Sequence, residues 1–154
     1  MTVPQTGRPG GIRATASKPS EWRTQAPVVA VVALGGGTGA AARYAASLWW
    51  PTQSGGFPWT TFGVNVVGCA VIGVFMVVIT EVRPAHRLVR PFFGTGVLGG
   101  FTTFSTYAVD IRYLFADGQI RTGLAYLAAT PLAALTSVWL AAWAARRLLK
   151  RRQS

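Results

Sequence analysis

The chain has 154 residues, of which 51% are hydrophobic and only 12% are charged, so it has room for one membrane domain and no second domain. Its net charge of +11 suggests nucleic acid, but the basic residues lie outside the apolar runs, where a membrane protein keeps its cytoplasmic arginines. We therefore expect a lipid bilayer and no nucleic acid as partner. The single cysteine, Cys69, excludes an intrachain disulfide.

Four uncharged runs are long enough to be membrane-spanning helices. They are 27–42, which extends past Arg43 to Trp50, then 59–80, 91–109 and 122–145. A soluble protein would interleave charges through such runs on a helical period. The sequence therefore predicts an all-α membrane protein with four transmembrane helices and a multi-pass location in the cell membrane.

Residues 1–26 are rich in Pro, Gly, Ser, Thr and Arg and lack apolar periodicity, which predicts a disordered basic cytoplasmic tail. A secretory signal is a competing interpretation, because 28–34 is apolar and three alanines at 40–42 resemble a cleavage site. It is disfavoured because the basic leader is long and the apolar run continues. We expect a four-span domain over 27–148 and a basic tail over 149–154.

The first expected span contains a glycine-rich stretch from Gly35 to Tyr44. A phosphate-binding loop is a weak interpretation, because no strand precedes it and no Lys-Ser/Thr follows it. Small residues that let helices approach closely are the stronger one. Arg43 has two open interpretations: a snorkelling side chain near the helix end, or a cation that attracts anions at a pore mouth.

The second expected span is rich in Val and Ile, and Asn65 is the only asparagine in the chain. An amide in a spanning helix commonly bonds neighbouring helices, and less often it is a ligand on a transport pathway. Gly68 and Gly73 predict close helix packing.

The third run contains a stretch at 94–107 with four glycines and four threonines. Glycine in a helix interior costs about 1 kcal/mol relative to alanine, so we expect this helix to be broken within the membrane. Irregular backbone at that depth survives only where it is buried in protein or lines a polar cavity. The stretch therefore predicts carbonyls, amides and hydroxyls that face something other than lipid. Beyond it, we expect Asp110, Arg112 and Asp117 to form a solvated edge or a local ion pair.

In the fourth run, Tyr126 and Thr130 are four residues apart and share a helix face. Pro131 follows, and its ring displaces the carbonyl of residue 127 from helical bonding. A stripe of hydroxyls is usually packing, but beside a broken helix it is also a candidate polar track.

The four runs contain no Asp, Glu, His or Lys. This absence disfavours a proton-coupled transporter, which needs a carboxylate in the membrane, and an enzyme, which needs a nucleophile with a base or a set of metal ligands. Hydroxyls, one amide, one arginine and backbone N–H groups remain, and they can donate hydrogen bonds to a small anion. The electropositive edges of aromatic rings can also contact an anion.

Three motifs, in order along the chain, resemble those of the Fluc/CrcB fluoride channels. They are Gly-Ala-x-x-Arg-Tyr at 39–44, Thr-Phe-Gly-Val-Asn-Val-Val-Gly at 61–68 and Gly-Gly-Phe-Thr-Thr-Phe-Ser-Thr-Tyr at 99–107. The resemblance implies passive export of fluoride by an antiparallel dimer with two pores and a structural sodium ion at its centre.

The resemblance also implies roles for individual residues. The fluoride-pathway positions are Arg43, Asn65, Phe104, Tyr107, Tyr126 and Thr130, and the sodium ligands are the backbone carbonyls of Gly99 and Thr102. Two positions depart from the family pattern: Tyr107 stands where the family has phenylalanine, and the next step of the polar track falls on Ala134, which cannot donate.

Four spans place the N-terminus, the loop at 81–90 and the C-terminus on one side of the membrane. The basic residues on that side are Arg8, Arg13, Lys18, Arg23, Arg83, Arg87, Arg90, Arg146, Arg147, Lys150, Arg151 and Arg152. The other side has Arg112 and Arg121, so both termini are predicted to be cytoplasmic. An antiparallel homodimer needs a chain that inserts both ways, with nearly balanced charges. We therefore hypothesise a chain that inserts one way and pairs with an inverted paralogue, with a homodimer as the alternative.

Two other functions stay open. A small four-span transporter or multidrug exporter is disfavoured by the missing membrane carboxylate. A subunit that does not itself conduct is kept open by the departures at Tyr107 and Ala134.

Overall fold

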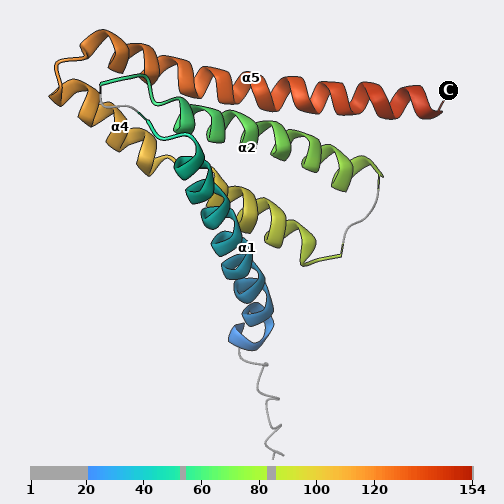
Figure 1. Ribbon diagram of the computed structural model, residues 1–154. Helices are drawn as coiled ribbons and strands as arrows, with labels where there is room; N and C mark the ends of the chain where they lie inside the picture. Colours follow the sequence, from blue (N-terminus) through green and yellow to red (C-terminus); the bar gives the residue numbers. More distant parts are fainter. Residues whose placement is uncertain (1–20, 53–54, 83–85, 154) are drawn as a thin grey trace, which may run out of the picture.

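The computed structural model describes residues 21–52, 55–82 and 86–153, which are helical apart from short turns and contain no strand. Figure 1 shows the arrangement of the elements. They are α1 (Glu21–Trp49), α2 (Trp59–Val77), the π-helical segments η1 (Val78–Val82) and η2 (Arg90–Leu98), α3 (Gly99–Phe101), α4 (Ser105–Ala116) and α5 (Ile120–Gln153). The all-α prediction is confirmed.

Three segments in the described part of the chain are long and apolar enough to cross a membrane. They are Gln25–Trp49, Trp59–Glu81 and Ile120–Arg151, which correspond to the first, second and fourth expected spans. The third expected span is not among them, because the chain from Arg90 to Ala116 is divided into shorter helices. The four-span topology and the dimer stay predictions.

The helices extend beyond the uncharged runs at both ends of the chain. Residues 1–20, most of the predicted N-terminal tail, lie outside the described residues, and α1 already begins at Glu21. At the other end, α5 continues through the basic segment to Gln153, so residues 149–153 are helical. Arginine, lysine, leucine and glutamine are all good helix formers, and charge alone does not end a helix.

The segment η2–α3 packs against α1 through glycines. A Cβ on Gly39 would lie 2.0 Å from the carbonyl oxygen of Val97, and a Cβ on Gly100 would lie 2.3 Å from that of Gly36. The two backbones are therefore in direct contact, as the small residues of the first span predicted. The glycines at 94–100 nevertheless remain helical, and close packing of Gly96 and Gly100 against α1 compensates for their low helix propensity.

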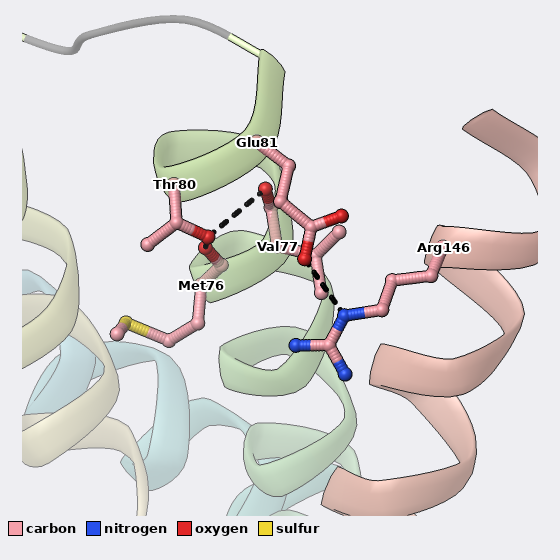
Figure 2. Close-up of polar contacts among 5 residues, drawn as sticks. All are labelled: Met76, Val77, Thr80, Glu81 and Arg146. Atoms are coloured by element: carbon pink, nitrogen blue, oxygen red, sulfur yellow. Dashed lines mark hydrogen bonds and ion pairs between the residues drawn. The ribbon is translucent and has the colours of Figure 1, made fainter. Parts of the chain in front are cut away.

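Helix α2 lies beside α5 and runs in the same direction (Figure 1). The Ser137 hydroxyl donates to the carbonyl of Val66 over 2.8 Å. A Cβ on Gly73 would lie 2.6 Å from the carbonyl oxygen of Val138, which confirms the predicted role of this glycine. At the end of the pair, Arg146 forms an ion pair of 2.7 Å with Glu81, shown in Figure 2. The ends of the two helices therefore lie at the same face of the molecule.

The small buried core lies where α4 packs against α5. Tyr107, Leu114 and Tyr126 form it, with Phe57 and Phe62 partly buried against it. Most other large apolar side chains are exposed, among them Leu135, which is 70% exposed. This pattern fits a chain whose outer surface faces lipid rather than water.

Candidate functional site

The helix that contains 94–107 is interrupted at Thr102, Thr103 and Phe104. Thr102 is extended, with φ −75° and ψ 157°, and α4 begins at Ser105. The predicted break within 94–107 is therefore confirmed, and it lies after the last glycine of the stretch. Gly68 on α2 makes room for it, because a Cβ there would lie 2.3 Å from the methyl group of Thr102.

Asn65 holds the break open. Its side chain is 8% exposed and pairs with the backbone of Thr103 in both directions. The Nδ2 group donates to the Thr103 carbonyl over 3.0 Å, and Oδ1 accepts from the Thr103 N–H over 2.8 Å. A primary amide has both a donor and an acceptor, so it can bond the N–H and the carbonyl of one residue that has lost its helical partners. The structure thus supports the first interpretation of Asn65, as a residue that bonds neighbouring helices.

Several backbone carbonyls lose their helical donors at the break, and two of them can be followed atom by atom. In a continuous helix the Thr103 N–H would bond the Gly99 carbonyl, but here it bonds Asn65. Likewise the Thr106 N–H would bond the Thr102 carbonyl, but it donates to the hydroxyl of Thr103 over 3.1 Å. The Thr103 hydroxyl therefore accepts from an N–H in the first turn of α4, although Thr103 itself lies before the N-cap residue Phe104. The carbonyls of Gly99 and Thr102, the two positions that the resemblance marks as cation ligands, are among those released at the break.

Arg43 reaches the break from α1. Its Nε donates to the carbonyl of Gly100 over 3.2 Å, and the side chain is half-buried. Neither sequence interpretation included this contact, which joins α1 to α3 through a carbonyl beside the break. The other guanidinium nitrogens keep their capacity to donate to an anion.

A cavity of about 290 Å³ opens beside the break. The cavity is lined by the guanidinium of Arg43, by hydroxyl groups and by small side chains, and no acidic residue is among the lining residues. The lining residues are Ala40, Arg43, Tyr44, Ser47, Thr60, Thr61, Val64, Thr103 and Thr106. Three of these hydroxyls already donate elsewhere: Ser47 to the Tyr44 carbonyl, Thr60 to the Trp50 carbonyl and Thr103 to Thr106. Because the guanidinium of Arg43 is the charged group of the lining, the cavity is suited to a small anion rather than to a cation.

Tyr107 and Tyr126 lie together in the core, with ring centroids 5.2 Å apart. The Tyr107 hydroxyl donates to the carbonyl of Leu127 over 2.7 Å, and the Tyr126 hydroxyl donates to Oδ2 of Asp110 over 3.2 Å. Asp110 is half-buried, so the prediction of a solvated edge or ion pair was wrong for this residue. Arg112 and Asp117 are exposed, as expected.

Thr130 lies one turn beyond Tyr126 on α5 and is 4% exposed. Within the described residues its hydroxyl has no hydrogen-bond partner. A buried polar atom without a partner is rare and is commonly satisfied by a water or a ligand. One face of α5 therefore carries two hydroxyls. That of Tyr126 is bonded to the Asp110 carboxylate, and that of Thr130 is available to a ligand.

Phe104 is not brought into this cluster. Its side chain is 80% exposed, although its ring centroid lies 5.7 Å from that of Tyr107. The predicted pathway residues thus fall into three groups in the single chain: Asn65 and Arg43 at the break, Tyr107, Tyr126 and Thr130 inside, and Phe104 on the outer surface.

Comparison with known proteins shows the family to which the chain belongs. The family model described as CrcB-like protein, Camphor Resistance (CrcB), matches residues 30–142. The chain belongs to the CrcB family. A CrcB relative of Streptomyces coelicolor, named fluoride-specific ion channel FluC 1, is 89% identical over 154 residues, which cover both chains completely. A fluoride-specific ion channel FluC 2 of Streptomyces avermitilis is 76% identical over 134 residues, which cover 84% of this chain and 85% of the relative. A fluoride-specific ion channel FluC 2 of Nocardia farcinica is 56% identical over 119 residues, which cover 77% of this chain and 85% of the relative.

Sequence reasoning missed Thr103 and Asp110 as residues of the site. The backbone of Thr103 pairs with Asn65, and its hydroxyl accepts from the Thr106 N–H in the first turn of α4. Asp110 lies three residues after Tyr107, on the same face of α4, and that spacing was the one available signal. Its partner Tyr126 comes from another helix, so the pairing depends on the tertiary packing.

Proposed function

We propose that the chain is a fluoride-selective ion channel that exports fluoride passively across the cell membrane, and not an enzyme. The observation that carries the proposal is the pairing of Asn65 with Thr103, which maintains a broken helix beside a cavity lined by Arg43 and hydroxyls. The three relatives, which are named fluoride-specific ion channels, support the choice of anion.

Selectivity would follow from replacing the water around a small anion by sparse, fixed donors in a narrow path, the logic of other ion filters. The residues for this path are Arg43, Asn65, Phe104, Tyr107, Tyr126 and Thr130. The unpartnered hydroxyl of Thr130 supports its place on the path. The edges of the Phe104 and Tyr107 rings add an electropositive surface without a formal charge.

We further propose that the pore is completed by a second chain, in an antiparallel dimer with two pores and four spans in each chain. The exposure of Phe104 supports a second chain, because a pathway side chain that is 80% exposed in one chain needs another surface to enclose it. The parallel course of α2 and α5 supports the four-span topology, since helices two and four of an up-and-down chain cross in the same direction.

A structural sodium ion at the centre of this dimer fits the residues present. The carbonyls of Gly99 and Thr102, whose helical donors are engaged by Asn65 and by Thr103, would hold it. Neutral carbonyl oxygens suit hard cations. The ion would supply a fixed positive charge between the two chains, while the protein residues keep the break open.

The distribution of basic residues supports cytoplasmic termini and a single orientation in the membrane. A chain with one orientation would pair with an inverted paralogue. Streptomyces avermitilis has relatives named FluC 2 and FluC 3, so at least one related organism has several such channels. Topology mapping of this chain expressed alone tests the orientation, and equal populations of both orientations would contradict it.

Fluoride efflux from liposomes tests the function. A channel gives passive, electrogenic fluoride flux, a transporter needs a proton gradient, and a non-conducting subunit gives no flux with any partner. Phe104→Ile then tests the site, because it keeps an apolar side chain and removes the ring. We expect fluoride flux to fall, and unchanged flux would remove the aromatic contact from the mechanism.

A further inference from the structure

Pro131 lies inside α5 and has no N–H group, so the carbonyl four residues earlier, that of Leu127, has no helical donor. The structure shows what replaces that donor. The hydroxyl of Tyr107, on α4, donates to the Leu127 carbonyl over 2.7 Å. One helix therefore completes the hydrogen bonding of another at the point where proline interrupts it.

A second hydrogen bond runs in the opposite direction between the same helices. The Tyr126 hydroxyl, from α5, donates to Asp110, one turn after Tyr107 on α4. The donors of the two bonds thus come from different helices and are buried, with Tyr107 8% exposed and Tyr126 0% exposed. Together, the two hydrogen bonds fix the rotation of α4 about its axis and its position along α5.

We propose that the Tyr107 hydroxyl is a positioning group, which holds α4 against α5 by bonding the carbonyl that Pro131 releases. It thereby sets the place of Tyr126 and Thr130, and of the break immediately before α4. A phenol has a single O–H, and this one is engaged with Leu127, so it does not donate to the transported anion. The ring keeps its place beside Phe104. This inference deepens the proposed function and rests on it for the pathway role of these residues.

The test is a double-mutant cycle of Tyr107→Phe with Pro131→Ala. The Pro131→Ala change restores an N–H that can bond the Leu127 carbonyl within the helix, so the Tyr107 hydroxyl is no longer needed there. Pro131→Leu restores the same N–H and suits an exposed position, so the cycle does not depend on one replacement folding. Tyr113→Phe is the matched control, because Tyr113 lies on the same helix and is 62% exposed.

Two readouts are compared: reversible unfolding in mixed micelles, followed by tryptophan fluorescence, and fluoride efflux per folded protein. With Pro131 present, Tyr107→Phe should lower the folded-to-unfolded ratio about three- to tenfold, the range for one buried hydrogen bond, and should slow efflux. In either Pro131 variant, Tyr107→Phe should leave the folded-to-unfolded ratio as it was before the change. Tyr113→Phe should change neither.

Equal losses from Tyr107→Phe in both backgrounds would overturn the inference, since the hydroxyl would then act independently of the Leu127 carbonyl. No loss with Pro131 present would overturn it as well. If the unmodified chain carries no fluoride together with its partner chain, the proposed function fails, while the unfolding cycle still decides the role of Tyr107.

Discussion

Replacing Asn65 with leucine should disrupt the break. Leucine has a similar size but cannot bond the N–H or the carbonyl of Thr103, and both bonds are lost at once. The Thr103 N–H is then free to return to the Gly99 carbonyl, which would extend the helix into the break. The Thr103 carbonyl is left without a donor.

The size of the effect follows from these two bonds. Leaving a buried donor or acceptor without a partner costs about 1–3 kcal/mol. Because Thr103 is only partly buried, we expect the loss of both bonds to lower the free energy of unfolding by about 2–3 kcal/mol. That corresponds to a roughly 30- to 150-fold lower folded-to-unfolded ratio. Fluoride efflux per folded protein should fall as well, because the cavity that Thr103 and Thr106 line is reshaped.

The assay is unfolding in mixed micelles together with liposome efflux, and Thr80→Val is the control. Thr80 lies in η1, which continues α2, is exposed and donates its hydroxyl to the carbonyl of Met76 in α2, as Figure 2 shows. Its replacement strands no group and should change stability by about 0.5 kcal/mol or less. If Asn65→Leu changes stability and fluoride efflux no more than Thr80→Val does, the Asn65 side chain does not maintain the break.

Two further predictions concern the packing of the helices. Gly39→Ala should prevent α1 from reaching η2, since its Cβ would lie 2.0 Å from the Val97 carbonyl oxygen, whereas a Cβ on Gly37 meets nothing within 4 Å. The yield of monodisperse protein after purification should collapse for Gly39→Ala and be retained for Gly37→Ala; similar yields would contradict the packing. Glu81→Gln should destabilise the protein by less than about 1 kcal/mol at low salt and by almost nothing at high salt, because Arg146 and Glu81 are 55% and 42% exposed. A loss that salt leaves unchanged would show that the ion pair is not the cause.

The sequence was sufficient to predict the helical class and the existence of the break. A long uncharged run in lipid satisfies its backbone groups as a helix. The stretch at 94–107 is a poor helix former because it is rich in glycine and threonine. The mechanism of the break was not predictable in the same way. Propensity favoured the glycines as its cause, but Gly96 and Gly100 pack against α1 as part of helices, and Asn65 and Thr103 hold the backbone apart instead.

The site shows the same division between local and tertiary information. That Pro131 releases the carbonyl of Leu127 follows from the chemistry of proline alone. Its partner Tyr107 lies 20 residues away and on another helix, so no local pattern predicts the bond. Asp110 was misread for the same reason, because its environment is set by Tyr126 rather than by its neighbours in sequence.

The central claim is a pore that conducts fluoride through one selective path. The most direct measurement is the reversal potential of the current through the protein reconstituted with its partner chain in a planar bilayer, with a fluoride gradient and symmetrical chloride. The partner chain is a second copy or the inverted paralogue. We predict a reversal potential that follows the fluoride gradient and is independent of the proton gradient. A reversal potential that follows chloride or protons, or a bilayer without current, would contradict the account.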